Sequence, residues 1–266
     1  MDMSQAQHAF VTGGASGLGL AIVDAMADRG LAVTMADIDA EALEQVVAGR
    51  GERVRGVVLD TRDRAGWEQA KAEAEAAFGP VDVLVNNAGI APNGREFADM
   101  EPESFDRILA INLVGVVNGV FAFGADMRAR GRGHIVNTSS QAGLVASVPG
   151  AGAYAVAKFG VTALSETLRR EMAPHGVGVS VLCPGLVTTN LGINTARISG
   201  VAPRAGLEMP PSDVKPDHVA AMVMQAIERD EAVVVTHRNV WRSMEPRLAA
   251  IKAACDLRDA AGSPAE

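Results

Sequence analysis

The sequence has few aromatic residues, few cysteines and no excess of positive charge. Aromatic residues make up 4% of its 266 residues, so the core has to be built mainly from aliphatic side chains. Cys183 and Cys255 lie far apart and form neither a disulfide framework nor a metal motif, which favours a reduced, cytoplasmic setting. The net charge of −8 argues against a nucleic-acid-binding protein, because such proteins concentrate Lys and Arg on one face.

Signals for membranes and metals are also weak. The N-terminal residues lack the basic and apolar regions of a signal peptide. Residues 108–125 carry no charge and reach the length of a short membrane span, but two asparagines and three glycines interrupt them. We therefore interpret this stretch as a buried helix and expect no membrane association. The five histidines show no ligand spacing, so no metal site is predicted.

Short apolar, β-branched runs alternate with longer helical patterns along the chain. Continuous apolar strands of this kind indicate a parallel sheet buried on both faces. The sequence therefore predicts one α/β domain over residues 1–266, a Rossmann-type doubly wound sheet of about seven strands with helices on both faces. Residues 255–266 are expected to form a flexible tail. The expected strands cover residues 8–14, 31–37, 54–60, 81–89, 134–140, 179–185 and 232–237, and the expected helices include 18–30, 41–50, 65–78 and 217–230.

A glycine-rich loop, "TGGASGLG" (12–19), joins the first strand to the first helix. Gly13, Gly17 and Gly19 permit a tight turn and the close approach of a pyrophosphate, which the N–H groups at the start of the helix can bind. The loop lacks the Lys-Ser/Thr pair of a mononucleotide P-loop. A strand–helix turn without any ligand stays an alternative interpretation.

Asp37 ends the second strand, about 20 residues beyond the glycine loop. A carboxylate at this place would accept hydrogen bonds from the adenosine ribose and repel the 2′-phosphate of NADP. The sequence therefore predicts NAD(H) in preference to NADP(H). Asp37 could instead cap the next helix, a role for which Asp39 is better placed.

The only tyrosine of the chain, Tyr154, precedes Lys158 by four residues. On a helix the two side chains lie on the same face. They form either a buried ring beside a surface charge or an acid–base pair. The pKa of a free tyrosine is about 10, and lowering it by about three units takes roughly 4 kcal/mol of preferential stabilisation of the phenolate. A neighbouring ammonium and an oxidised nicotinamide ring would supply it.

Several motifs occur together and in one order, and on these the sequence resembles the short-chain dehydrogenase/reductase family. The resemblance covers about residues 8–190 and extends more loosely to about residue 240. The residues that carry it are Thr12-Gly13-x3-Gly17-Leu18-Gly19, Asp60, Asn86-Asn87-Ala88-Gly89, Asn112, Ser140, Tyr154-x3-Lys158, and Pro184-Gly185 followed by Thr188.

The resemblance implies a role for each of these groups. Tyr154 would be the general base in oxidation and the acid in reduction, and Lys158 would also hold the nicotinamide ribose. Ser140 would orient the substrate oxygen, whereas Ser139 would face the other side of the sheet by strand alternation. Asn112 would stabilise a proton-relay water. Cofactor contacts are implied for Gly13, Ser16, Gly17, Leu18, Gly19, Asp37, Asp60, Thr61, Asn86, Ala88, Gly89, Tyr154, Lys158, Pro184, Gly185, Val187 and Thr188.

Each catalytic candidate also has a purely structural interpretation, such as a serine that ends a strand or a buried amide. We prefer the catalytic interpretation because it explains all four residues at once. The expected function is hydride transfer between NAD(H) and a secondary alcohol or ketone with apolar or aromatic bulk. One alternative is an NADPH-type carbonyl or β-ketoacyl reductase, against which Asp37 argues. Another is a catalytically silent dinucleotide-binding regulator, although such proteins usually lack the tyrosine or the lysine.

The last expectations concern the substrate and the assembly. Residues 190–215 are interpreted as an irregular lid over the active site, in which Arg197 and Arg204 are candidates for holding an acidic group. The segment "GHIVNTSS" (133–140) resembles the corresponding segment of bacterial family members that act on aryl alcohols. In this family the helices expected at 102–128 and 151–173 pair between subunits, which implies a homotetramer or homodimer. Trp67 and Trp241 are interpreted as packing residues.

Overall fold

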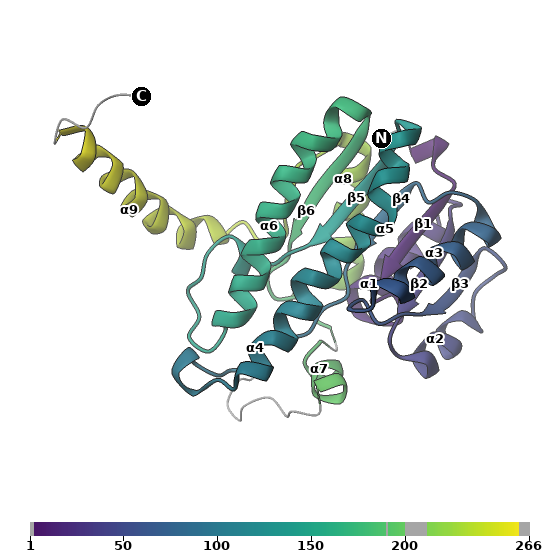
Figure 1. Ribbon diagram of the computed structural model, residues 1–266, viewed down its shortest axis with the longest axis horizontal. Coiled ribbons are helices and arrows are strands. Elements are labelled where there is room, and N and C mark those ends of the chain that lie inside the picture. The colour runs from purple at the N-terminus through teal and green to yellow at the C-terminus, as the bar shows by residue number, and fades with distance from the viewer. Residues whose placement is uncertain (1–2, 190, 200–211, 261–266) are drawn as a thin grey trace.

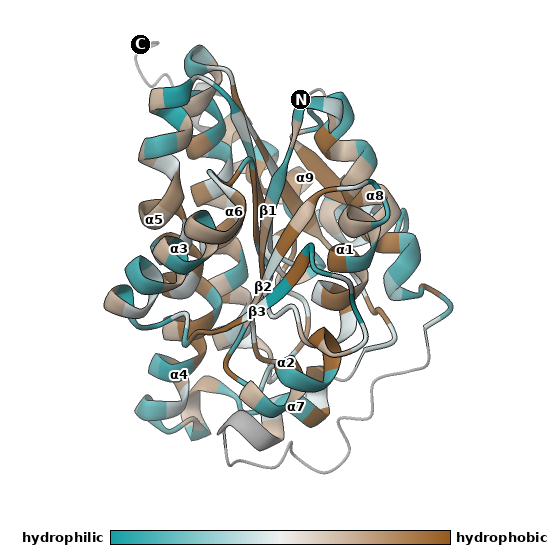
Figure 2. Cartoon of the chain, turned by 90° about the vertical axis from the view of Figure 1, so that its right-hand side faces the viewer, coloured by the Kyte–Doolittle hydropathy of each residue, from teal (hydrophilic) through white to brown (hydrophobic). Residues whose placement is uncertain are grey.

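The computed structural model describes residues 3–189, 191–199 and 212–260. They form a seven-stranded, fully parallel sheet in the order β3-β2-β1-β4-β5-β6-β7, with helices on both faces (Figures 1 and 2). The predicted doubly wound Rossmann-type fold is confirmed. The strands are β1 (His8–Thr12), β2 (Ala32–Asp37), β3 (Val54–Val58), β4 (Val83–Asn86), β5 (Gly133–Thr138), β6 (Val177–Cys183) and β7 (Val233–Val235).

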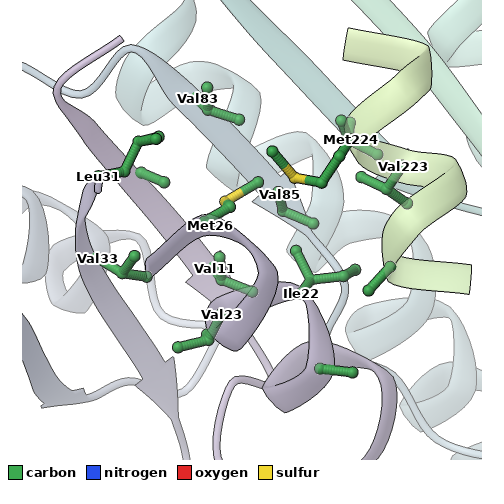
Figure 3. Packing of buried hydrophobic residues seen from close by; sticks show 14 of the residues in the cluster. Val11, Ile22, Val23, Met26, Leu31, Val33, Val83, Val85, Val223 and Met224 are labelled. Atoms are coloured by element: carbon green, nitrogen blue, oxygen red, sulfur yellow. The ribbon is translucent and has the colours of Figure 1, made fainter. Parts of the chain in front are cut away.

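Helices α1, α2 and α8 cover one face of the sheet, and α3, α5 and α6 cover the other. Because each strand is buried on both sides, neighbouring side chains of one strand enter different cores. Val11 packs in the first core (Figure 3), whereas Phe10 contacts Trp67 and Phe123 in the second. The helices are α1 (Gly17–Ala27), α2 (Ala40–Val47), α3 (Arg64–Phe78), α4 (Pro102–Leu109), α5 (Gly115–Arg130), α6 (Gly152–Met172), α7 (Leu191–Ser199), α8 (Pro216–Arg229) and α9 (Val240–Ala260).

The apolar stretch predicted as one buried helix is divided. A π-helical turn, Ala110–Val114, separates α4 from α5. Together these residues, Pro102–Arg130, form a helix that is long and apolar enough by length and composition to cross a membrane, and 44% of its most apolar window is buried inside the protein. The buried side chains of α5, which include Phe123 and Met127, pack against the sheet in the second core.

Three expectations about the second half of the chain need correction. Residues 191–199 form helix α7 and not part of an irregular loop, while Arg204 lies outside the described residues. Residues 255–260, assigned to a flexible tail, continue helix α9, and residues 261–266 lie outside the described part. Trp67 is a buried packing residue as expected, but Trp241 is 56% exposed, because α9 leaves the body of the protein beside α6 (Figure 1).

Candidate active site

The glycine loop needs its glycines for two reasons. Gly13 and Gly17 have φ angles of 64° and 53°, in the left-handed region that favours glycine. A Cβ at Gly19 would lie 2.0 Å from the carbonyl oxygen of Gly13, so the first turn of α1 packs directly on the loop. Ser16, at the N-cap position, makes no capping bond with its side chain. The first-turn N–H groups of α1 therefore receive no partner from it and suit an anion such as a pyrophosphate.

Asp37 lies at the end of β2, beside the glycine loop. Its carboxylate accepts hydrogen bonds from the backbone N–H groups of Ala15 and Asp39, each at 3.2 Å. Burial raises the pKa of Asp37 above its ordinary value, and these hydrogen bonds partly offset the rise. The cap of α2 is Asp39, which accepts from the N–H of Ala42. Asp37 is thus a separate residue from the cap of α2, as the sequence indicated.

The "NNAG" segment after β4 is tied to the end of β1. The hydroxyl oxygen of Thr12 accepts from the N–H groups of Asn87 and Ala88 at 2.9 and 3.0 Å. The side chain of Asn86 instead donates to the side chain of Asn137 on the neighbouring strand β5. Any contact of Asn86 with a dinucleotide would therefore use its backbone. Both loops lie at the carboxyl ends of the central strands, the edge at which doubly wound sheets bind ligands in a crevice.

Asp60 and Thr61 follow β3 at the outer part of this edge. The carboxylate of Asp60 is paired with Arg62, which holds the pKa of Asp60 below its ordinary value. The carbonyl of Thr61 accepts hydrogen bonds from the indole of Trp67 and the amide of Asn118, at 2.9 and 3.0 Å. These contacts fix the backbone of the segment beside the crevice.

Tyr154 and Lys158 lie one turn apart near the start of α6. The ammonium nitrogen of Lys158 is 5.6 Å from the centroid of the Tyr154 ring and donates to the carbonyl of Thr138 at 2.8 Å. Lys158 is 3% exposed, and burial lowers its pKa to about 8. Burial raises the pKa of Tyr154, and a hydrogen bond with Ser140 acts in the opposite direction. In the chain alone, therefore, desolvation of the phenolate outweighs the effect of its neighbours.

The two adjacent serines after β5 face different surroundings. Ser140 contacts Tyr154 and accepts from the N–H of Ala142. Ser139 is buried and donates to the carbonyl of Lys158 at 2.8 Å. The expectation that Ser139 faces the other side of the sheet is wrong, because its hydroxyl contacts Lys158 and Thr162 on α6, the helix that also carries Tyr154.

Asn112 is completely buried in the π-helical turn. Its amide accepts from the N–H of Ile90 at 2.8 Å and donates to the carbonyl of Ile90 at 2.9 Å. A Cβ at Gly89 would lie 2.9 Å from the amide oxygen of Asn112 and 3.7 Å from the nitrogen of Lys158. The glycine thus lets the "NNAG" segment pass close to both side chains. Asn112, Ser140, Tyr154 and Lys158 are brought together as the sequence predicted.

The segment after β6 contains Pro184, Gly185, Val187 and Thr188, for which contacts with the cofactor were expected. The carbonyl of Pro184 accepts from the N–H of Gln141, and the N–H of Gly185 donates to Thr236. Val187 packs on the first core, and the hydroxyl of Thr188 donates to the carbonyl of Ser212. Hydrogen bonds and apolar packing therefore hold this segment in place.

Three contributors were not identified from the sequence. Thr138 acts through its carbonyl, which any residue type would supply, so no sequence signal exists for it. On α7, Asn194 donates to the hydroxyl of Ser16 at 2.9 Å, and Thr195 accepts from the N–H of Ala91 at 2.8 Å. Helix α7 thus bridges the glycine loop and the segment after "NNAG". Among the residues that the structure describes, no group of His, Cys, Asp or Glu is arranged to hold a metal.

Comparisons with known proteins point to one family. The family model described as short chain dehydrogenase matches residues 7–197. The chain is 35% identical over 236 residues to a probable oxidoreductase, EphD, of Mycobacterium tuberculosis; the match covers 84% of this chain but only 40% of that protein. It is 40% identical over 195 residues to a C alpha-dehydrogenase of Sphingobium, covering 70% of this chain and 62% of that one.

Among solved structures, the fold is similar to that of a short-chain dehydrogenase/reductase from Burkholderia phymatum in complex with NAD. The TM-score is 0.83 at 28% identity, and the match covers 96% of this chain and 97% of that chain. The agreement extends over the sheet and the helices on both of its faces.

Proposed function

The chain belongs to the short-chain dehydrogenase/reductase family, and from that membership we propose that it transfers a hydride between NAD(H) and a secondary alcohol or its ketone. The observation that carries the proposal is the pair of Tyr154, which is partly buried, and Lys158, which is buried, with Ser140 hydrogen-bonded to the phenol. An acid–base group of this kind at the carboxyl ends of the strands is suited to moving a proton while a hydride leaves or reaches the adjacent carbon.

Two features of the glycine loop support the binding of a dinucleotide. Gly13 and Gly17 leave space without Cβ atoms where a pyrophosphate approaches, and the start of α1 presents N–H groups there. Asp37 supports NAD over NADP, because a carboxylate repels a second phosphate and no Arg or Lys occurs in the loop at 12–19. When bound, the nicotinamide supplies the hydride acceptor and, in its oxidised form, a positive charge.

The chain's own residues then handle the proton. In oxidation, Tyr154 takes the hydroxyl proton of the alcohol; in reduction it returns a proton to the ketone oxygen. Ser140 donates to the same oxygen and stabilises the charge that develops there. The ammonium of Lys158 lies close enough to Tyr154 to favour the phenolate form. Its hydrogen bond to the carbonyl of Thr138 fixes the position of the ammonium. Asn112 acts by holding the backbone of Ile90, next to Gly89.

We assign the substrate to alcohols with an apolar or aromatic substituent. Exposed apolar side chains lie on segments beside the catalytic residues: Phe97 is 59% exposed and its ring lies against Gly152, two residues before Tyr154. Val148, 62% exposed, belongs to the segment that leads into α6. The similarity to a C alpha-dehydrogenase supports an aryl alcohol.

The test is a spectrophotometric assay at 340 nm that combines NAD or NADP with a panel of aryl and alkyl secondary alcohols. We expect turnover with NAD and bulky alcohols. Ser140→Ala should lower kcat by about 10²-fold or more, whereas the adjacent Ser139→Ala should leave the chemical step intact. A preference for NADP would refute the role of Asp37, and equal effects of the two serine variants would refute the role of Ser140.

The assembly is a further part of the proposal. Exposed apolar side chains in the π-helical turn (Val114), on α5 (Phe121) and on α6 (Val156) support pairing of these helices between subunits in a homotetramer or homodimer. Light scattering that gives the mass of a monomer at micromolar concentration would refute it.

A further inference from the structure

Helix α9 is not covered by the described part of its own chain. From Trp241 to Leu257 every residue is exposed except Met244, which is partly buried. Its contact with the body includes the guanidinium of Arg247, 5.2 Å from the ring centroid of Phe159 on α6. Figure 1 shows the helix extending away from the sheet. A lone helix of this length is only marginally stable in water, because helices gain most of their stability from packing an apolar face. Packing of its exposed apolar face against a partner would therefore stabilise α9.

Five side chains of α9 form one apolar seam. Trp241, Met244, Leu248, Ile251 and Cys255 follow one another at alternating intervals of three and four residues. This is the spacing of the a and d positions of a coiled coil, which place all five side chains along one side of the helix. Pro246 falls at position f, on the side opposite the seam, so its ring does not enter the packing surface. We call these five residues the α9 seam.

We propose that the α9 seam packs antiparallel against the α9 seam of a second copy of this chain. The seam is self-complementary when Leu248 of one copy faces Ile251 of the other, since the two-fold axis then also places Met244 opposite Cys255. Each contact occurs twice, as a two-fold interface requires. The partner is thus another molecule of the same protein.

The charges beside the seam select the antiparallel orientation. Glu245 and Lys252 occupy e positions, and Arg247 occupies a g position. In a parallel pair, g of one helix lies beside e of the other, so Arg247 would lie beside Lys252 and the two would repel. In the antiparallel pair the e positions meet, so Glu245 lies beside Lys252 twice. In the single chain Lys252 pairs with Asp256 on its own helix, an exposed contact that Glu245 of the second copy can join.

Disulfide trapping tests the register directly. Cys183 is buried and Cys255 is exposed, so Cys255 is the natural thiol available for cross-linking. Under mild oxidation, Met244→Cys should give a covalent dimer on a non-reducing gel, because the introduced thiol faces Cys255 of the second copy. The double variant Met244→Cys/Cys255→Ser should give none, since the two positions 244 lie about 16 Å apart along antiparallel helices and a disulfide needs Cα atoms within about 7 Å.

A matched pair of further variants keeps the test decisive. Adding Leu248→Glu to Met244→Cys should abolish the cross-link, because a carboxylate then has to be buried in the seam. Adding Leu257→Glu, at position c outside the seam, should leave it intact. A covalent dimer of the natural chain through Cys255 would show parallel packing and overturn the proposal. Absence of a covalent dimer from Met244→Cys, or Leu248-dependent binding of the chain to phosphatidylserine vesicles, would overturn it too.

Discussion

Helices α6 and α9 each contain 21 residues but relate to the rest of the molecule in opposite ways. Helix α6 buries nine of its residues against β5, β6 and the π-helical turn, and Lys158 is one of them. Helix α9 buries none between Trp241 and Leu257. The comparison shows that a functional side chain needs a helix fixed from several sides, because packing holds Lys158 against Thr138 while shifting its pKa. A helix that buries so few of its side chains is suited instead to contacts with another molecule.

The largest effect is expected at Tyr154 on α6. Tyr154→Phe removes one hydroxyl group and should lower kcat by about 10²–10⁴-fold, because the proton then has no acid or base at the reacting oxygen. Binding of NADH, followed by its fluorescence, should be unchanged. Turnover retained by Tyr154→Phe would contradict the catalytic role assigned to this residue of α6.

The next effect concerns packing on α6. Leu168 is 7% exposed in the second core, so Leu168→Ala should lower the free energy of unfolding by about 2–5 kcal/mol. Urea denaturation followed by far-ultraviolet circular dichroism measures this loss. A change below about 0.5 kcal/mol would mean that α6 is not packed as described.

A smaller effect of opposite sign is expected for Lys158→Met. Burial lowers the pKa of Lys158 in the folded protein from 10.5 to about 8, so below pH 8 the folded state carries a buried charge that costs stability. The cost disappears as the pH rises from about 8 to 10.5, because there the unfolded chain binds more protons. At pH 7 the variant should be inactive but more stable by about 1–3 kcal/mol, since the lost bond to Thr138 offsets part of the gain. Denaturation at pH 7 and pH 10 tests this: a stability difference that does not shrink with pH would contradict it.

The smallest effect belongs to α9. Leu257 is 72% exposed and lies outside the α9 seam, so Leu257→Ala should change the free energy of unfolding by less than about 0.5 kcal/mol. It is the matched control for Leu168→Ala, because the same atoms are removed from a helix of equal length. A loss near that of Leu168→Ala would show that this side of α9 is also covered.

Much of the fold followed from local patterns in the sequence. The strands were recognised because each is an apolar run buried on both faces, and the glycine loop because positive φ angles at Gly13 and Gly17 favour one residue type. Tyr154 and Lys158 were recognised from a spacing of one helical turn. In each case the physical requirement acts between residues close in sequence, or on the residue itself.

Other features had no local signal. The π-helical turn places Asn112 against Ile90, 22 residues away, and its sequence is apolar like that of an ordinary buried helix. Helix α7 was predicted as irregular because its glycine and small residues are poor helix formers, yet Thr195 and Asn194 hold it to segments distant in sequence. Trp241 was interpreted as a packing residue, although it is 56% exposed. The sequence alone does not distinguish an exposed indole on a helix from a packed one.

The sequence by itself determined the parallel sheet, the crevice glycines and the identity of the four candidate catalytic residues. Only the tertiary structure decided that the ammonium of Lys158 is held by a carbonyl, that Asn112 holds a loop, and that α9 stands apart from the core. The reason is that residue type limits what a side chain can do, whereas burial and hydrogen-bond partners depend on segments that meet only after the chain has folded.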